Sequence, residues 1–510
     1  MAQHRVASLS ELPENEMRTV EAGEAKVLLI RRGESVHALA ALCPHKGVPL
    51  DKGIIDGDRI VCGIHRAAFE IASGEVVEPP ACESLRRYEV TIRGDDVHVE
   101  VPEGAEPHPV PTMVSRTATT PDTRHAVIVG AGAAGWTAAE TLRREGFTGR
   151  ISVVTDEEDL PYDRTDLSKS YLKADDPKDP WRRDAAFCEA HDIAVLRGHA
   201  ESLNTDDKRL VLAGGRPVAY DMVLLATGCD ARRLDVPGAD LDGIHTIRSL
   251  ADAKALRADV ASLPDGAKVA VVGGGFVGME AAASLGGRGF DVTAVLMDEV
   301  PFKAVIGERM GRRLREEHES NGVSFRVGKA SGFAGEGRVE RIELEDGEPV
   351  EASLVVVGIG AAPRTGWLDL DTDEDGGIAV NADCSVPGVE AVWAAGDIAR
   401  IPTPWGAARI EHWRHAQQLG ALAARAMLGR DAAYSEAPFF WTMQWIGGSY
   451  SYTGHAEEWD ETRVEGDPDG PSFIQSFLKD GKVMATFGHG MLERQTAIER
   501  AMAKEGPLPA

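Results

Sequence analysis

The stretch AVIVGAGAAGWTAAETLRREG, residues 126–146, decides the fold of the central part of this chain. An apolar strand runs into a turn that contains Gly130, Gly132 and Gly135, and an amphipathic helix follows. In such a turn the first glycine permits the bend, the second lets a pyrophosphate approach the backbone, and the third lets helix and strand pack closely. The stretch predicts a dinucleotide-binding α/β unit. A glycine-rich turn without a nucleotide is the alternative.

Two carboxylates give this glycine motif the context that it needs. The next strand, RISVVTDEE at residues 150–158, ends in Asp156 and Glu157. They follow the glycines by about 20 residues, where a carboxylate can accept hydrogen bonds from the hydroxyls of a ribose. Asp156 and Glu157 are therefore candidate ligands of the first dinucleotide.

The same order of strand, glycine turn and helix recurs in KVAVVGGGFVGMEAAASLGGRG, residues 268–289. Gly273, Gly275 and Gly278 occupy the three glycine positions. Two units of this kind predict that the chain binds two dinucleotides. An ordinary glycine-rich turn in an α/β core is again the alternative.

The second unit departs from the motif where it selects its nucleotide. The strand FDVTAV is followed by Leu296, Met297, Asp298 and Glu299, with an apolar residue where NAD-specific relatives have Glu. No Arg follows immediately to pair with a 2′-phosphate, so nothing positively supports NADPH. The sequence favours NADH, with Asp298 or Glu299 as substitutes for the missing carboxylate.

Two cysteine–histidine pairs lie in an amino-terminal region that reads as short β-strands. Cys43-Pro-His45 is followed after 16 residues by Cys62-Gly-Ile-His65. Two thiolates on one iron and two imidazoles on the other are the ligands of a Rieske 2Fe-2S cluster. A mononuclear zinc site with the same ligands and a disulfide between the two cysteines are the alternatives. Zinc ligands usually come in Cys-x-x-Cys and His-x-x-x-His order, so the iron–sulfur cluster is favoured.

About residues 5–103 resemble the Rieske family in these ligand motifs and their spacing, with Gly53, Phe69 and Gly74 at the family's turn and core positions. The resemblance implies an all-β domain with a 2Fe-2S cluster on Cys43, His45, Cys62 and His65. The loops CPHKG and CGIHRAAF lack the additional cysteines of the cytochrome type. The ferredoxin type is therefore the better match.

Composition limits the classes of function. The 510 residues include 55 Lys and Arg against 82 Asp and Glu, a net charge of -27 that opposes binding to nucleic acid or an anionic membrane. The sequence has no long uncharged apolar run of the kind that forms a signal peptide or a spanning helix. We therefore expect a cytoplasmic protein without membrane insertion. Six cysteines without a Cys-x-x-Cys pair disfavour a disulfide scaffold and disulfide chemistry.

Residues 124–430 resemble the two-dinucleotide flavoprotein reductases, which include the ferredoxin reductases of bacterial oxygenase systems and apoptosis-inducing factor. Besides the glycine turns, the motifs that carry the resemblance are LPYDRTDLSKSYL (160–172), LLATGCDARR (224–233), VVGIGAAPRTG (356–366), VWAAGDIA (392–399) and RIEHWRHAQQLG (409–420). The stretches PFFWTMQW (438–445) and SYTGHAEEWDE (451–461) agree with the Rieske-containing apoptosis-inducing factor relatives. With the Rieske-like region in front, the resemblance extends from end to end.

The resemblance implies roles for individual residues. Arg164 and Lys169 reach the flavin, and Glu280 pairs with Lys169, so that Lys169 and Glu280 are the candidate catalytic residues. The further cofactor-binding positions are Ala226 and Gly228 beside the adenine nucleotide, Gly360 in the strand that closes the NAD domain, Gly396 and Asp397 at the ribityl chain, and Trp413 near the flavin ring. Simpler alternatives stay open: a core aromatic for Trp413, a surface lysine for Lys169, and a helix first-turn carboxylate for Glu280.

The expected fold class is multidomain: an all-β Rieske domain, an α/β reductase with two dinucleotide-binding domains, and a small α+β carboxy-terminal domain. The expected boundaries are 1–103 for the Rieske domain, 104–123 for a linker, 124–247 and 366–430 for the two parts of the FAD-binding domain, 248–365 for the NAD(P)H-binding domain, and 431–510 for a carboxy-terminal dimerisation or interface domain. A homodimer stays open.

The resemblance implies an NAD(P)H-dependent flavoprotein reductase. A hydride passes from NAD(P)H to FAD, the electrons pass singly to the cluster, and an acceptor such as an oxygenase receives them. Redox or NADH sensing in signalling, of the apoptosis-inducing type, is the alternative function, and oxygen reduction is a third. The final acceptor cannot be read from the chain.

Charge also bears on how the two redox modules meet. Residues 1–103 carry 12 basic and 18 acidic side chains, and the remainder carries 43 and 64, so the modules repel on average. A flexible linker of about 20 residues would keep their local concentration in the millimolar range. We therefore hypothesise that covalent fusion replaces electrostatic docking.

Overall fold

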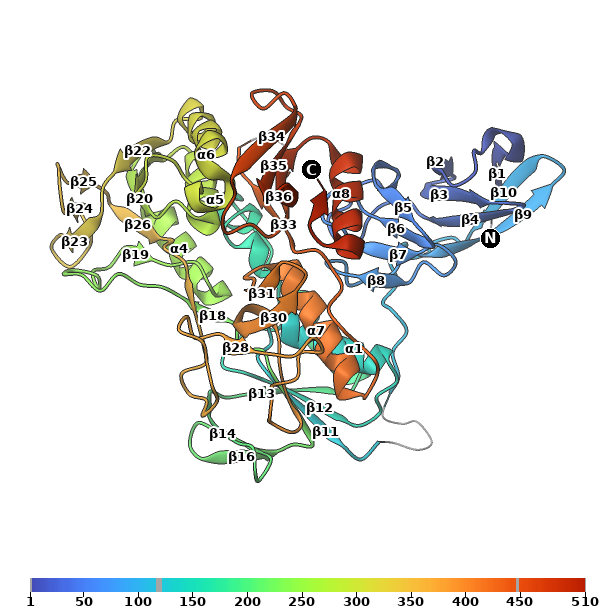
Figure 1. The fold of residues 1–510 in the computed structure, drawn as a ribbon, viewed down its shortest axis with the longest axis horizontal. Coiled ribbons are helices and arrows are strands. Elements are labelled where there is room, and N and C mark those ends of the chain that lie inside the picture. The colour runs from blue at the N-terminus through green and yellow to red at the C-terminus, as the bar shows by residue number, and fades with distance from the viewer. Residues whose placement is uncertain (1, 116–121, 446–448, 510) are drawn as a thin grey trace.

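The computed structural model describes residues 2–115, 122–445 and 449–509. The amino-terminal sheets lie at one end of the molecule and the second parallel sheet at the other (Figure 1). The carboxy-terminal sheet lies between them, and the first parallel sheet lies below (Figure 1). The predicted fold class is confirmed: a β-rich amino-terminal region precedes an α/β reductase region.

The amino-terminal region consists of two antiparallel sheets. The larger has the order β1-β10-β9-β4-β3-β2 and the smaller β5-β6-β7-β8. A run of four buried residues in β3 supplies much of its core, and the turn from β3 to β4 is made at Gly33, whose φ is +60°. The bounds are β1 Ala2–Ser8, β2 Met17–Ala22, β3 Ala25–Arg32, β4 Ser35–Ala40, β5 Ile54–Asp56, β6 Arg59–Val61, β7 Ala68–Glu70, β8 Val76–Glu78, β9 Arg87–Arg93 and β10 Asp96–Val101.

The first parallel sheet has the order β13-β12-β11-β17-β29. Its three central strands, β12, β11 and β17, are almost entirely buried, as expected for a parallel sheet covered on both faces. The helices α1 and α7 pack so closely that a Cβ on Gly420 would lie 2.1 Å from the carbonyl oxygen of Ala134. The bounds are β11 His125–Val129, α1 Ala133–Arg144, β12 Arg150–Thr155, β13 Ile193–Arg197, β17 Met222–Leu225, β29 Val392–Ala394 and α7 Trp413–Met427.

The second parallel sheet has the order β19-β26-β20-β21-β22. In the sequence, its strands lie between the two stretches of chain that form the first sheet. The last strand of the first sheet, β29, follows β26 and pairs with β17. Ser249 and Asp252 form a reciprocal cap at the start of α4. The bounds are β19 Ile244–His245, α4 Leu250–Ser262, β20 Lys268–Val272, α5 Phe276–Gly286, β21 Asp291–Leu296, α6 Lys303–Ser320, β22 Ser324–Val327 and β26 Leu354–Val357.

Short elements connect the two parallel sheets and extend their edges. The strands form three three-stranded sheets, β14-β15-β16, β23-β24-β25 and β28-β30-β31, and the two-stranded pair β18-β27. The bounds are α2 Ser170–Lys173, α3 Ala185–Ala190, β14 Ala200–Asn204, β15 Arg209–Leu212, β16 Arg216–Ala219, β18 Cys229–Ala231, β23 Ala330–Ala334, β24 Arg341–Leu344, β25 Val350–Glu351, β27 Ala361–Pro363, β28 Ile378–Ala379, β30 Ala399–Thr403 and β31 Gly406–Arg409.

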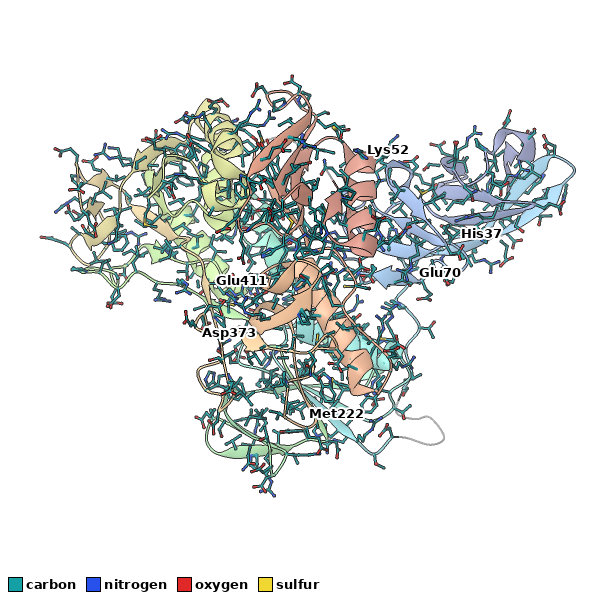
Figure 2. All side chains as sticks on the ribbon, in the orientation of Figure 1. His37, Lys52, Glu70, Met222, Asp373 and Glu411 are labelled. Carbon is teal, nitrogen blue, oxygen red and sulfur yellow. The ribbon has the colours of Figure 1, made fainter. Side chains whose placement is uncertain are left out.

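The carboxy-terminal sheet has the order β32-β33-β36-β35-β34, and β37 pairs with β36. A hairpin joins β35 and β36 at Asp480 and Gly481, which both have positive φ as a type I′ turn requires. The helix α8 leaves this sheet and lies beside β5 of the amino-terminal region (Figure 1), and side chains fill the junction (Figure 2). The bounds are β32 Phe439–Met443, β33 Ser449–Gly454, β34 Glu461–Gly466, β35 Phe473–Lys479, β36 Lys482–His489, α8 Leu492–Glu505 and β37 Leu508–Pro509.

Part of the predicted linker, residues 104–123, makes backbone hydrogen bonds to its neighbours. The backbone N–H of Arg86 donates to the carbonyl oxygen of Pro107 (2.9 Å), and the N–H of Ser84 donates to that of Pro109 (2.9 Å). Further along, the N–H of Val114 donates to a carbonyl of α1 (3.1 Å). Backbone hydrogen bonds therefore connect this segment first to the amino-terminal region and then to α1.

Candidate functional site

The two cysteine–histidine loops converge at one end of the amino-terminal region. Cys43 and His45 follow β4, and Cys62 and His65 follow β6; none of the four is more than 6% exposed. The Nδ1 atoms of His45 and His65 lie 3.0 Å apart, so both imidazoles point at one place. Both cysteines are free thiols in the structure.

The chemistry of these four side chains fits a 2Fe-2S cluster. Burial lowers the pKa of His45 to about 3 and that of His65 well below its usual value, so both rings are neutral donors. A hydrogen bond with Cys43 lowers the pKa of the Cys62 thiol to about 7. The four side chains form two like pairs, Cys43 with Cys62 and His45 with His65, and each Rieske iron takes two protein ligands of one kind.

The first glycine turn has the close contacts that its sequence predicts. Gly130 has a φ of +116°, and a Cβ there would lie 2.1 Å from the carbonyl oxygen of Ala226. A Cβ on Gly135 would lie 1.9 Å from the carbonyl oxygen of Gly130, whereas nothing lies within 4 Å of one on Gly132. The backbone at Gly132 is therefore open to a ligand beside a tightly packed strand and helix.

The second glycine turn repeats this geometry. Gly273 has a φ of +114°, and its Cβ would lie 2.3 Å from the carbonyl oxygen of Gly358; a Cβ on Gly278 would lie 2.7 Å from that of Gly273. A Cβ on Gly275 would meet only the carbonyl oxygen of Gly358 within 4 Å, at 3.8 Å. Nearby, Leu296 is buried and packs against the glycine turn.

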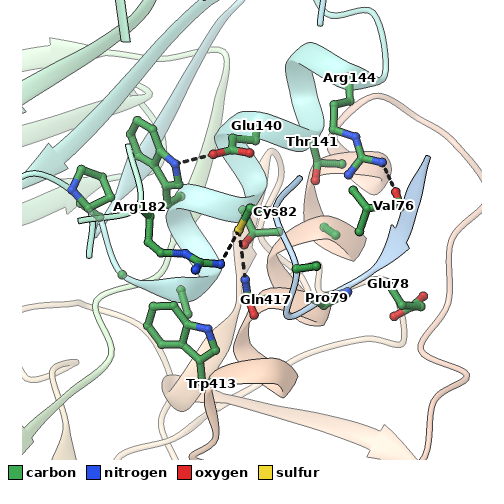
Figure 3. A pocket seen from close by; sticks show the side chains of 18 of the residues that line it. Val76, Glu78, Pro79, Cys82, Glu140, Thr141, Arg144, Arg182, Trp413 and Gln417 are labelled. Atoms are coloured by element: carbon green, nitrogen blue, oxygen red, sulfur yellow. Dashed lines mark hydrogen bonds between the residues drawn. The ribbon is translucent and has the colours of Figure 1, made fainter. Parts of the chain in front are cut away.

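A cavity lies at the amino terminus of α1, between the first glycine turn and the cluster-bearing region (Figure 3). One wall comes from the turn and from Trp413, and the opposite wall is the segment from Val76 to Cys82, which consists of β8 and the residues after it. Arg182 contacts the second wall, because it donates to the sulfur of Cys82 (3.0 Å) and to the carbonyl oxygen of Pro80 (3.1 Å). No sequence pattern connects the segment from Val76 to Cys82 with the glycine turn, so sequence reasoning missed this wall of the cavity.

Several predicted ligands of the first dinucleotide are held by arginines. Asp156 accepts from Arg364 (2.5 Å), and Glu157 accepts from Arg164 (2.7 Å). Asp397 accepts from Arg248 (3.0 Å) and follows Gly396, whose φ is +78°. The structure thus places Glu157 and Arg164 in one ion pair.

The structure also brings Lys169 and Glu280 together across the two parallel-sheet regions. Lys169 Nζ lies 2.9 Å from a carboxylate oxygen of Glu280, which is only 5% exposed. The same carboxylate accepts from the hydroxyls of Ser168 (2.6 Å) and Thr442 (2.8 Å). All its neighbours therefore donate, which is how a buried carboxylate is stabilised.

The remaining predicted positions lie at turns between the two sheets. Ala226 donates its N–H to the carbonyl oxygen of Val129 (2.8 Å), and Gly228 follows with a φ of +67°. Gly360 has a φ of +99° and accepts from the backbone N–H of Arg232 (2.9 Å).

The cluster loops face the segment that carries Arg164 and Lys169. Lys46 pairs with Asp166 (2.8 Å), and His45 Nε2 lies 3.9 Å from a carboxylate oxygen of Asp163. Sequence reasoning had named neither aspartate, and it had missed Trp441, which contacts the ring of His65. Only the stretch PFFWTMQW had drawn attention to Trp441.

Comparisons with known proteins identify the family of each of the two regions. The Rieske [2Fe-2S] domain model matches residues 2–89, and the model of the pyridine nucleotide-disulphide oxidoreductase family matches residues 124–420. Apoptosis-inducing factor 3 of Homo sapiens is 36% identical over 94% of this chain and 80% of its own length. The ferredoxin–NAD(+) reductase component of the biphenyl dioxygenase system of Paraburkholderia xenovorans is 36% identical over 70% of this chain and 88% of its own.

A solved structure gives the same result for the fold. The covalent putidaredoxin reductase–putidaredoxin complex matches 75% of this chain and 94% of its own, with a TM-score of 0.71 and 26% identity. The chain therefore belongs to the pyridine nucleotide-disulphide oxidoreductase family, as an NAD(P)H-dependent FAD reductase of the ferredoxin reductase type preceded by a Rieske 2Fe-2S domain.

Proposed function

We propose that electrons from NAD(P)H pass through FAD, singly, to the Rieske cluster of the same chain and then to a separate acceptor such as an oxygenase component. The observation that carries this proposal is the packing of the cluster loops on the flavin side of the reductase. Lys46 pairs with Asp166 at 2.8 Å, only two residues from Arg164 and three from Lys169. The relative in the biphenyl dioxygenase system is named a ferredoxin–NAD(+) reductase, which supports electron delivery to an iron–sulfur protein.

The residues that would hold FAD lie around the first glycine turn. Backbone groups at Gly130, Gly132 and Gly135 would receive the pyrophosphate, and Asp156 or Glu157 the ribose. When bound, FAD supplies the exchange of a hydride for single electrons. The amino terminus of α7, at Trp413, would stabilise negative charge on the reduced ring through the helix dipole.

The pair of Lys169 and Glu280 would orient the nicotinamide against the flavin. Glu280 holds the ammonium group of Lys169 at 2.9 Å, so the lysine side chain cannot swing freely. Gly360 would leave room for the nucleotide beside it. NADH is the proposed donor, since no Arg directly follows Leu296 to pair with a 2′-phosphate. Glu299 or Asp298, which pairs with Lys303 at 3.2 Å, would stand in for the missing carboxylate.

One variant tests the order of carriers. Cys43→Ser removes a cluster ligand, so NADH should still reduce the flavin and a small artificial acceptor, while the electron paramagnetic resonance signal of the cluster disappears. The control is His98→Asn on β10, a strand that carries neither ligand loop. This variant should keep both the reduction of the flavin and the cluster signal. If Cys43→Ser also abolished flavin reduction, the proposed order would be wrong.

Redox or NADH sensing is a second candidate, because a relative named apoptosis-inducing factor 3 spans 94% of the chain. Sustained turnover with cytochrome c would favour the reductase, whereas a slow, long-lived complex of reduced flavin and NAD would favour sensing.

A homodimer also stays a proposal, to be checked by size-exclusion chromatography with light scattering. On α8, Arg500 pairs with Asp56 of the amino-terminal region of the same chain (2.9 Å).

No helix in residues 2–115, 122–445 and 449–509 is long and apolar enough to cross a membrane.

A further inference from the structure

A short segment of the amino-terminal region, residues 76–83, is held by side chains of the reductase. This β8 segment consists of β8 and the five residues after it. Three arginines donate to its backbone carbonyl oxygens: Arg144 to Val76 (2.5 Å), Arg414 to Pro79 (3.2 Å) and Arg182 to Pro80 (3.1 Å). These arginines come from α1, from α7 and from the stretch before α3, so three parts of the reductase hold one segment.

An ion pair fixes the far end of the β8 segment. Arg183, which is only 7% exposed, pairs with Glu83 (2.5 Å) and with Glu140 on α1 (2.8 Å). It also donates to the carbonyl oxygen of Cys82 (3.3 Å). Arg183 is thus shared between a carboxylate of the amino-terminal region and one of the reductase. Because a buried charge without its partner is strongly unfavourable, a change at Glu83 would loosen this contact.

The β8 segment covers the cavity whose other lining comes from the reductase (Figure 3). Gly132, at which the backbone is open, lies in that lining together with Trp413 and Gln417. Among the described residues, two buried polar atoms of this lining have no hydrogen-bond partner, the indole nitrogen of Trp413 and the side-chain oxygen of Gln417. Buried polar atoms are nearly always satisfied, so this donor and this acceptor indicate a bound molecule. The phosphate oxygens and hydroxyl groups of FAD fit both.

We propose that the β8 segment is part of the FAD site and closes it, so that the amino-terminal region holds FAD as well as the cluster. The inference rests on the proposed function, which places the FAD pyrophosphate at the first glycine turn, and it adds a second region to that site. The β8 segment is separate from the ligand loops, which follow β4 and β6. Because FAD and the segment share one cavity, each stabilises the binding of the other by the same free energy.

The rate at which the oxidised full chain releases FAD tests this inference. Glu83→Arg places a second cation beside Arg183 and should displace the β8 segment. Released FAD, followed by the rise of its fluorescence on dilution, should then dissociate about tenfold faster. Glu83→Gln removes only the charge and should give a smaller increase. The control is Glu89→Arg, because this exposed residue of β9 pairs with Arg87 of its own region (3.7 Å). It should release FAD at the rate of the unaltered chain, and the cluster signal in electron paramagnetic resonance should persist in all three.

The shielding of Cys82 provides a second measurement, in which no residue is changed. Cys82 lines the cavity, whereas Cys188, on α3, is not among the described residues that line it. A small thiol reagent, with the labelled peptides identified by mass spectrometry, should modify Cys82 severalfold more slowly in the FAD-loaded chain than after FAD has been removed. The rate at Cys188 should be the same in both.

Three results would overturn the inference. One is release of FAD from Glu83→Arg at the rate of the unaltered chain, and another is equal labelling of Cys82 with and without FAD. The third is loss of the cluster signal in both Glu83 variants, which would show that the amino-terminal region unfolds rather than opens. None of these measurements involves electron transfer, so they do not depend on whether NADH reduces the cluster. A chain that bound no FAD would instead contradict the proposed function itself.

Discussion

Gly135 shows how little space the first glycine turn leaves to a side chain. A Cβ there would lie 1.9 Å from the carbonyl oxygen of Gly130 and 3.0 Å from a methyl of Ile128. Because the first of these atoms is backbone, it cannot move aside without displacing the turn. Overpacking of this kind costs about 1–3 kcal/mol. The same displacement would disturb the backbone groups proposed to receive the pyrophosphate.

Gly135→Ala should therefore lower the fraction of FAD that stays bound. We expect purified Gly135→Ala to retain markedly less flavin after desalting, measured as the ratio of absorbance at the flavin and protein maxima. Gly366→Ala is the control, since nothing lies within 4 Å of a Cβ on this exposed glycine. Equal flavin content in Gly135→Ala and the unaltered chain would contradict the proposed FAD site.

Residue-scale prediction from the sequence succeeded where one residue type is required by local chemistry. The glycines of both turns and the four cluster ligands could be found because spacing along the chain sets their geometry. Trp441 could not, because an aromatic residue in an apolar strand suits any core, and its contact with His65 depends on docking between regions hundreds of residues apart. Arg66 was equally hidden: it follows His65 with a φ of +66° and is only 1% exposed.

At the scale of elements, a buried histidine joins α6 to the carboxy-terminal region. His318 Nε2 lies 2.9 Å from the side-chain oxygen of Gln444 and therefore donates to it, while Nδ1 accepts from the indole N–H of Trp445 (2.9 Å). This arrangement requires a neutral ring. Burial lowers the pKa of His318 from 6.5 to about 4.

The sign of the resulting pH dependence follows from that shift. The unfolded chain binds a proton at His318 near pH 6.5 and the folded chain only near pH 4, so the contribution is complete above pH 6.5 and is lost as the pH falls towards 4. Its size is about 3 kcal/mol. In urea unfolding, the stability difference between the unaltered chain and His318→Asn should be constant above pH 7 and should shrink by about this amount at pH 4. A difference that is constant over the whole range would contradict a neutral, buried His318.

The helices, strands and turns could be predicted from the sequence more fully than the contacts between them. Strand and helix periodicity and the turn at Asp480 and Gly481 are local, and the structure has them. The contact of α8 with β5, and the fixing of Pro107 and Pro109 along the amino-terminal region, are not local. Proline and polar residues in 104–123 are typical of a linker, but their backbone carbonyls can still accept hydrogen bonds from a neighbouring loop.

On the scale of the whole molecule, the net charges of the two modules repel each other, whereas the charges at their contact attract. Residues 1–103 and the remainder are both acidic, yet opposite charges meet where they touch: Lys46 with Asp166 (2.8 Å), and Asp56 with Arg500 (2.9 Å) and Lys504 (2.6 Å). The hypothesis that fusion replaces electrostatic docking is therefore too simple. Long-range repulsion and short-range attraction act together, and the tether overcomes only the first.

Salt should separate these two effects once the chain is cut. Repulsion between distant exposed charges is screened when the Debye length falls from about 30 Å at 0.01 M to about 8 Å at 0.15 M salt, whereas partly buried pairs are screened much less. With a protease site placed after Thr112, the two fragments should associate faster at 0.15 M than at 0.01 M salt in biolayer interferometry. Asp56→Asn should raise the dissociation rate by about tenfold, because Arg500 loses a partner that is only 17% exposed. Asp58→Asn, an exposed neighbour, should not. Association that slows steadily as salt is added would show that the contact pairs, rather than net charge, govern the encounter.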